Sequence, residues 1–116
     1  MKINKNGSIS ISPNAIASVA ASSALTSYGI VGMASKNIMD GLANAIAHDP
    51  RHGVEVTIDE DQIAVDLYII IEYGTRITSV ATSVANTVQY QVEKSIDLPV
   101  VAVNVHVQDL RVSNGS

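Results

Sequence analysis

The chain contains no cysteine, no phenylalanine and no tryptophan, and its only aromatic residues are four tyrosines. Without cysteine, the fold cannot depend on a disulfide or a thiolate metal site, and no thiol nucleophile is available. Hydrophobic residues make up 47% of the chain, and most of them are valine, isoleucine and alanine. Because β-branched side chains are stiff at χ1 and favour strands, this composition predicts a core of sheet packed against helix.

Long hydrophobic runs are also missing. No apolar run approaches the ~20 residues that a membrane-spanning helix needs, and the amino end, MKINKNGSISIS, lacks the apolar region of a secretory signal. We therefore expect a cytoplasmic protein that reaches the inner face of the membrane only through a partner. The net charge is −4 and the seven basic residues are scattered. Nucleic acid is not expected as a partner, because phosphate binding usually needs clustered Lys and Arg.

The chain length predicts a single domain over 1–116, because 116 residues fall within the commonest size range of domains. No internal repeat or low-complexity segment divides it. We expect an ordered core over about 8–110 and a frayed tail over 111–116, since unanchored chain ends are poorly ordered.

The first half contains a clear helix start. Ser12 is a suitable N-cap and Pro13 fits the first helical position, so we expect a helix over 14–28. Gly29 is placed to end this helix, because glycine readily adopts the left-handed conformation of a C-cap. The other elements expected in this half are a short strand at 8–11, a second helix at 35–47 and a loop at 48–53.

The second half has the pattern of two strands, a long helix and a third strand. The expected elements are strands at 54–58 and 63–73, a helix at 75–94 and a strand at 100–110. An acidic turn at 59–62 joins the first two strands, and Thr75 is the expected cap of the helix. The apolar stripe of that helix consists of Ile77, Val80, Ala81, Val84, Ala85, Val88 and Val92.

These elements predict an α+β fold. The order strand, helix, strand between 63–73 and 100–110 indicates a parallel crossover, so the sheet should be mixed. We expect a small three-stranded sheet, packed on one face by the long helix of the second half and by the amino-terminal helix. The short strand at 8–11 could add to this sheet.

The candidate functional surface is the polar side of the sheet. Strand alternation places polar side chains of 63–73 and 100–110 away from the core, and the corner after the first of these strands carries a tyrosine and an arginine, which are enriched at interface anchors. A histidine near two carboxylates is material for acid–base chemistry, but no nucleophile or metal ligand accompanies it, so partner binding is the favoured interpretation. The candidate residues are Asp66, Tyr68, Glu72, Tyr73, Arg76, Asn104, His106 and Gln108.

A G-x-x-G sequence lies between the two helices expected in the first half. Gly29 and Gly32 enclose Ile30 and Val31, and a loop of this kind clamps nucleotides in KH domains. Because its middle residues are apolar rather than basic, a structural turn that buries both side chains is the favoured interpretation. A KH-like module for single-stranded nucleic acid, using the loop 29–32, is the alternative function.

Two further groups resemble metal sites. His48 and His52 have the spacing of a helical zinc pair, but Pro50 lies between them and no third ligand has a suitable spacing. Asp59, Glu60 and Asp61 lack the spacing of a calcium loop. A solvated loop and an acidic hairpin turn are the favoured interpretations, so we expect no metal, no cofactor and no catalytic residue.

Several segments in order along the chain resemble the alkaline shock protein family of Gram-positive bacteria. They are GSISISPNAIASVAASSA at 7–24, GIVGM at 29–33, GVEV at 53–56, IAVDLYIIIEYG at 63–74, VANTVQYQVE at 84–93 and VVAVNVHVQDL at 100–110. The stretch 36–52 is not typical of the family, and the chain lacks long charged extensions.

The resemblance implies a non-enzymatic interaction or scaffold protein that serves cell-envelope stress homeostasis. Family members are expected to act by self-association or by docking to a membrane-anchored protein. The family has no catalytic motif to carry over, so the resemblance assigns no catalytic residue to this chain.

Overall fold

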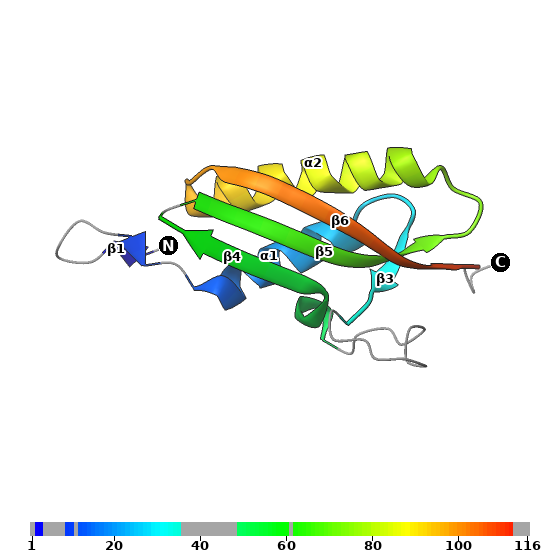
Figure 1. Ribbon diagram of the computed structural model, residues 1–116, viewed down its shortest axis with the longest axis horizontal. Helices are drawn as coiled ribbons and strands as arrows, with labels where there is room; N and C mark the ends of the chain where they lie inside the picture. The colour runs from blue at the N-terminus through cyan, green and yellow to red at the C-terminus, as the bar shows by residue number, and fades with distance from the viewer. Residues whose placement is uncertain (1, 4–8, 11, 36–48, 61, 113–116) are drawn as a thin grey trace.

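The computed structural model describes residues 2–3, 9–10, 12–35, 49–60 and 62–112. Figure 1 shows a long, twisted sheet with two helices against it. In chain order the elements are β1 (Lys2–Ile3), β2 (Ile9–Ser10), α1 (Pro13–Leu25), β3 (Ile30–Met33), the 3₁₀ helix η1 (Pro50–Gly53), β4 (Val54–Asp59), β5 (Gln62–Glu72), α2 (Ile77–Ile96) and β6 (Val100–Arg111).

Strand β5 is the centre of a four-stranded mixed sheet. Strand β6 pairs with it in parallel along one edge, while β4 and β3 pair antiparallel with successive parts of the other edge. The predicted α+β class is confirmed, and the parallel crossover through α2 is present. Strand β3 was not expected, because it is short and its only signal was the G-x-x-G sequence.

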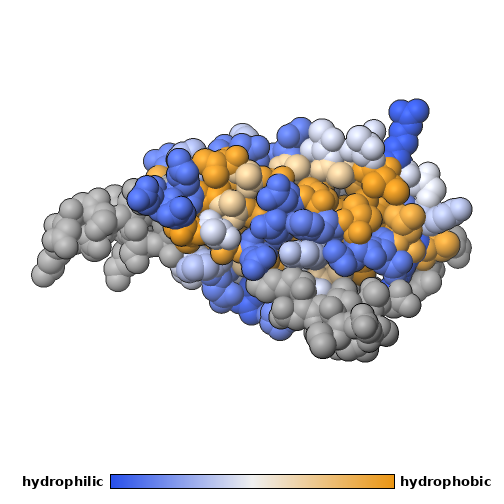
Figure 2. Space-filling model, viewed as in Figure 1, coloured by the Kyte–Doolittle hydropathy of each residue, from blue (hydrophilic) through white to orange (hydrophobic). Residues whose placement is uncertain are grey.

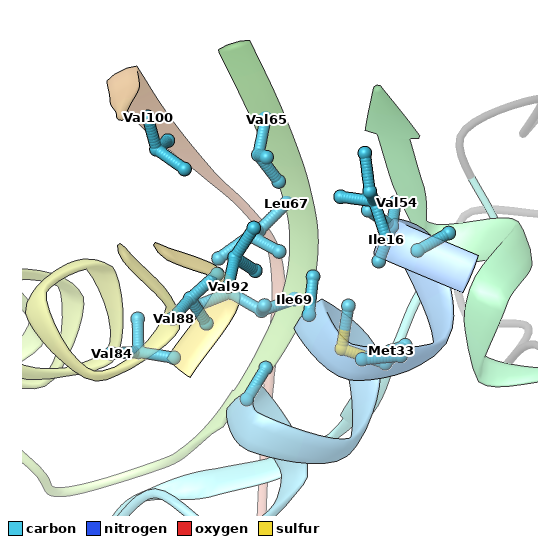
Figure 3. Packing of buried hydrophobic residues seen from close by; sticks show 14 of the residues in the cluster. Ile16, Met33, Val54, Val65, Leu67, Ile69, Val84, Val88, Val92 and Val100 are labelled. Carbon is cyan, nitrogen blue, oxygen red and sulfur yellow. The ribbon is translucent and has the colours of Figure 1, made fainter. Parts of the chain in front are cut away.

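Both helices pack on the same face of this sheet, as predicted (Figure 3). Every second residue of β5 is buried beneath them, and α2 contributes a buried residue at every fourth position. The resulting cluster includes Ile63, Val65, Leu67, Ile69 and Ile71 of β5, Val80, Val84, Val88, Val92 and Ile96 of α2, and Ile16, Ala20 and Ala24 of α1. The small alanines let α1 approach the sheet closely, which explains how a core without Phe or Trp is filled.

Helix α1 begins as predicted and ends earlier. The amide of Ala15 donates to Ser12 Oγ at 3.3 Å, and Pro13 occupies the first turn. The helix stops at Leu25, and Gly29 lies in the turn that follows, with φ +86°. A Cβ at Gly29 would lie 2.8 Å from Val80 Cγ2, so glycine is needed here both for the backbone conformation and for the close approach of α2.

The G-x-x-G segment is an edge strand, so the predicted turn between two helices is wrong. Ile30 opposes Ile71 and Gly32 opposes Ile70, with a bulge between these pairs. Ile30 is half-buried and Val31 is exposed, so the expected burial of both side chains is also wrong. Because the backbone of this segment is used in the sheet, the geometry of a KH nucleotide clamp is absent, and the alternative nucleic-acid function loses its motivating feature.

The other differences are local. The expected loop at 48–53 contains η1, and β4 and β5 approach more closely than predicted, since Asp59 already pairs with Gln62 and Glu60 takes φ +48°. Helix α2 begins at Ile77 after Arg76, and the hydroxyl of Thr75 donates to the Glu72 carbonyl instead of capping the helix.

Three predictions on chain segments have different outcomes. Strand β2 pairs with β1 in a separate two-stranded ribbon rather than adding to the main sheet. Arg111, assigned to the frayed tail, is part of β6, and its carbonyl accepts from the Tyr73 amide at 2.7 Å. The predicted helix at 35–47, along with His48 and Asp61, lies outside the described residues, apart from Ser35, which is not helical.

Candidate partner-binding surface

The open face is the side of the main sheet that faces away from α1 and α2. On β5 it carries the residues that alternate with the core positions, and the parallel register places Asp66 opposite Asn104 and Tyr68 opposite His106. These four predicted site residues are therefore brought together. Alternation predicted which way each of them points, but only the pairing of β5 with β6 makes them neighbours.

His106 makes two contacts across this strand pair. Its Nε2 atom lies 3.0 Å from Asp66 Oδ1, and its ring stacks on Tyr68, with centroids 4.6 Å apart and 12° between the ring planes. The side chains of His106 and Asp66 are 41% and 23% exposed, so the group is accessible from solvent. These contacts fix the orientations of the His106, Asp66 and Tyr68 side chains relative to one another.

The phenol of Tyr68 is influenced by two carboxylates. Its pKa is raised above the ordinary value of 10.0, first by partial burial and then by the negative charges of Glu55 and Asp66. Glu55 lies on β4 opposite Asp66, so it belongs to the same surface. Sequence reasoning missed Glu55 as a site residue, although its alternation with Val54 and Val56 already indicated that it points away from the core.

The far end of the open face differs from the prediction because β6 contains a bulge. Val107 opposes Ile69 and Asp109 opposes Ile70, so Gln108 is the extra residue. The bulge reverses the alternation, and Asp109 and Arg111 take the positions beside Ile70 and Glu72. Arg111 Nε donates to Asp109 Oδ2 at 3.1 Å. The predicted residue Gln108 is thereby replaced on this face by an ion pair.

Tyr73 and Arg76 lie beyond the end of β5, in the turn that leads to α2. The Tyr73 side chain is 69% exposed, so its ring does not pack into the core. Arg76 lines a cleft of about 430 Å³ together with Tyr28, Ser79 and other residues of this corner. The surface at Arg76 is therefore concave. Tyr28, which the sequence did not indicate, also lines this cleft, whereas Tyr73 does not.

A second cleft, of about 440 Å³, lies between the start of α1 and η1. Arg51 Nη2 is 2.6 Å from Asp49 Oδ2, and hydrogen bonds from Arg51 lower the pKa of the Asp49 carboxyl to about 2. Among the described residues, no group of three or more His, Cys, Asp or Glu side chains is arranged to hold a metal ion.

Figure 2 shows the side of the molecule on which the sheet strands lie in front. Hydrophilic residues form a band across the middle of this view, and hydrophobic residues lie on both sides of the band. This side of the molecule therefore presents both polar and apolar residues.

Comparison with known families shows to which family the chain belongs. The model of the alkaline shock protein family, described by its "cell envelope-related function", matches residues 1–112. The chain belongs to the alkaline shock protein family. The predicted resemblance is thus confirmed, and the cell-envelope assignment applies to this alkaline shock protein at the level of the family.

Two curated relatives are similar to this alkaline shock protein over nearly its whole length. The protein YloU of Bacillus subtilis (strain 168) is 47% identical over 112 residues, which are 95% of this chain and 93% of YloU. The protein Spy1614 of Streptococcus pyogenes serotype M6 is 34% identical over 97% of this chain and 95% of its own length.

A third relative has a name that states a role. A "stress response regulator gls24 homolog" of Streptococcus pyogenes serotype M3 is 35% identical over 83 residues, which are 72% of this chain and 45% of that relative. The family is therefore a stress-response family related to the cell envelope. No solved structure matches this chain. None of the helices in the described part of the chain has the length and apolar character required to cross a bilayer.

Proposed function

We propose that this chain is a non-enzymatic scaffold protein of cell-envelope stress homeostasis, which works by binding protein partners. The single observation that carries the proposal is the organised open face, where Asp66 and Tyr68 of β5 hold His106 of β6 from two sides. The partners are a membrane-anchored protein or another copy of the chain, and recruitment to the inner face of the membrane follows from binding the former.

The arrangement of His106 favours binding over catalysis. An acid–base histidine acts on a substrate held within hydrogen-bond reach, and enzymes usually hold substrates in concave pockets. His106 and Asp66 lie instead on the surface of a sheet, and neither lines the clefts at Arg76 and Asp49. The contact between His106 and Asp66 therefore supports a role in binding a protein partner rather than in catalysis.

The open face has the physical properties of a binding surface. Tyr68 is an amphipathic ring of the kind enriched in interfaces. Because its stacking on His106 and the hydrogen bond to Asp66 already restrict these side chains, they lose less conformational entropy when a partner binds. The exposed Tyr73 and Arg76 at the adjoining corner extend the surface with two further residues of the interface type.

The test is capture of partners from gently lysed cells by the tagged chain, with half of each lysate treated with nuclease. We expect nuclease-insensitive retention of a protein, and loss of that protein with the Tyr68→Ala/Arg76→Ala double variant. Thr82→Ala, an exposed change on α2, is the matched control and should retain it.

Three results would contradict the proposal. If the double variant captured the same proteins in the same amounts, the open face and its corner would not be the binding surface. Partners that disappear with nuclease would instead indicate nucleic-acid binding. Equal loss with Thr82→Ala would show that the effect is not specific to the surface.

A further inference from the structure

The outer edge of β6 is paired with no other strand in the part of the chain that the structure describes. Strand β6 has 12 residues, and among the described strands β5 is its only partner. A long edge strand is a template for pairing with another chain, and proteins usually cover or shorten such an edge. Here the edge is restricted at both ends, which leaves a defined window.

The first restriction is at Val100. Its amide donates to Glu93 Oε2 at 2.8 Å, and its carbonyl accepts from Gln89 Nε2 at 3.1 Å. Two side chains one turn apart on α2 therefore satisfy both backbone groups of this residue, as a neighbouring strand would. Pairing with another chain cannot include Val100 unless these hydrogen bonds are broken.

The second restriction is the bulge at Gln108, where the regular register of β6 on β5 ends. Another bulge residue, Val101, lies next to the hydrogen-bonded Val100. Bulges increase local twist and disturb a ladder, so a regular pairing is confined to the stretch between them. The window for an added strand is thus 102–107.

The centre of this window is symmetric in sequence. The window is Ala-Val-Asn-Val-His-Val, and Val103 and Val105 lie symmetrically around Asn104. A two-fold axis through Asn104 would pair Val103 with Val105 of a second copy, on the helix side of both sheets. The window contains no acidic residue, no lysine and no arginine, so no carboxylate or ammonium groups of like charge would oppose each other.

We propose that this window pairs antiparallel with the same window of a second copy of the chain, with Asn104 on a two-fold axis. An isologous interface requires one surface patch to be complementary to itself, and the symmetry about Asn104 provides this. Apolar surface is available for burial, since the side chains of Val101 and Val107 are 56% and 36% exposed. The inference rests on the proposed function, which gives another copy of the chain as one of its partners, but it uses the edge of the sheet rather than its open face.

The absence of cysteine makes the register directly testable. In Asn104→Cys the two cysteines would face each other across the axis, at a Cα separation of about 4.5–5.5 Å, which is within disulfide range. In the matched control Gln108→Cys, on the same strand, the two cysteines would be about 27 Å apart at 3.4 Å per residue. We expect mild oxidation to convert Asn104→Cys to a covalent dimer and to leave Gln108→Cys monomeric.

The second measurement is the mass of the purified, untagged chain in solution. We expect about twice 12.2 kDa for the wild type, and 12.2 kDa for Asn104→Lys, because two ammonium groups would oppose each other on the axis. Asn86→Lys makes the same change on the exposed face of α2 and should remain a dimer. Circular dichroism of both variants confirms that they are folded.

The proposal is overturned by a wild-type mass of 12.2 kDa at about 1 mM, a concentration at which even a millimolar Kd populates the dimer. It is also overturned by equal cross-linking of both cysteine variants, or by a dimer that Asn86→Lys dissociates and Asn104→Lys does not. Both measurements use the purified chain alone, so they are independent of whether the open face captures another protein.

Discussion

The imidazole of His106 lies nearly parallel to the phenol ring of Tyr68, with the ring centroids 4.6 Å apart. The same imidazole is held by Asp66 through a 3.0 Å contact. The two strands that supply these residues run in the same direction, and α2 connects them. A long helix is thus required to bring two distant polar segments onto one surface, which links the architecture of the fold to the proposed binding role.

The ionisation of Tyr68 should report the charges of the open face. Glu55 and Asp66 raise the pKa of Tyr68 together with partial burial, so Glu55→Gln should lower that pKa by removing a nearby negative charge. NMR titration of the labelled tyrosine ring measures the change. Glu72→Gln is the control, because Glu72 is not among the causes of the shift; an equal effect of both variants would contradict the prediction.

The same shift should contribute to the dependence of stability on alkaline pH. Since the folded-state pKa of Tyr68 is raised above 10.0, the folded state favours the neutral phenol. Its contribution to stability is complete below pH 10 and is lost as the pH rises through the folded-state pKa. Tyr68→Phe cannot ionise at this position, so its stability should fall less steeply above pH 10 than that of the wild type in denaturant titrations.

Gly29 and Gly74 provide a matched pair of backbone positions. Both have positive φ, but a Cβ at Gly29 would lie 2.8 Å from Val80 Cγ2, whereas a Cβ at Gly74 would meet no heavy atom within 4 Å. We expect Gly74→Ala to cost about 1–2 kcal/mol from the backbone alone, and Gly29→Ala to cost more because of the added clash. Chemical denaturation measures both, and equal losses would refute the close approach of α2.

The hydrogen bonds from α2 to Val100 should stabilise the start of β6. We expect Glu93→Ala to cost about 1–2 kcal/mol, since the amide of Val100 would lose a charged acceptor in a mostly buried position. Hydrogen exchange at this amide should become faster. Ser95→Ala, an exposed change two residues from Glu93 on the same helix, should leave the exchange rate unaltered. If the two variants behaved alike, Glu93 would not be the acceptor in solution.

The buried stripe of α2 should be sensitive to the truncation of a single valine side chain. Val88 is fully buried between α2 and the sheet, so Val88→Ala should cost about 2 kcal/mol from lost transfer free energy and the residual cavity. Asn86→Ala, on the exposed side, should stay within about 0.5 kcal/mol of the wild type. Urea denaturation compares them, and equal stabilities would contradict the packing described for α2.

Much of the fold was predictable because its signals are local. The alternation in β4, β5 and β6 and the apolar stripe of α2 each depend on neighbouring residues and on the period of the element. The predicted burial was wrong where it depends on the exact residue at which a helix begins. Ile77 was assigned to the buried stripe but is 43% exposed, because α2 begins at this residue and its first turn extends beyond the core.

The bulges of β6 show the limit of periodicity. Alternation from Asn104 and His106 correctly predicts the open face but then assigns Gln108 to it, whereas Asp109 occupies that position. A single extra residue reverses the side of every residue that follows. Since a bulge is recognised only against the partner strand, the sequence of β6 alone could not reveal it.

The sequence by itself determined the family through the resemblance of its segments to known sequences. It also determined the α+β class and the polar character of the residues that face away from the core, because composition and periodicity are properties of contiguous segments. Tertiary structure decided which of these residues meet. Asp66 contacts His106 only because β5 pairs with β6 in one parallel register. That register is set by the packing of α2 beneath both strands, a non-local interaction that no single segment encodes.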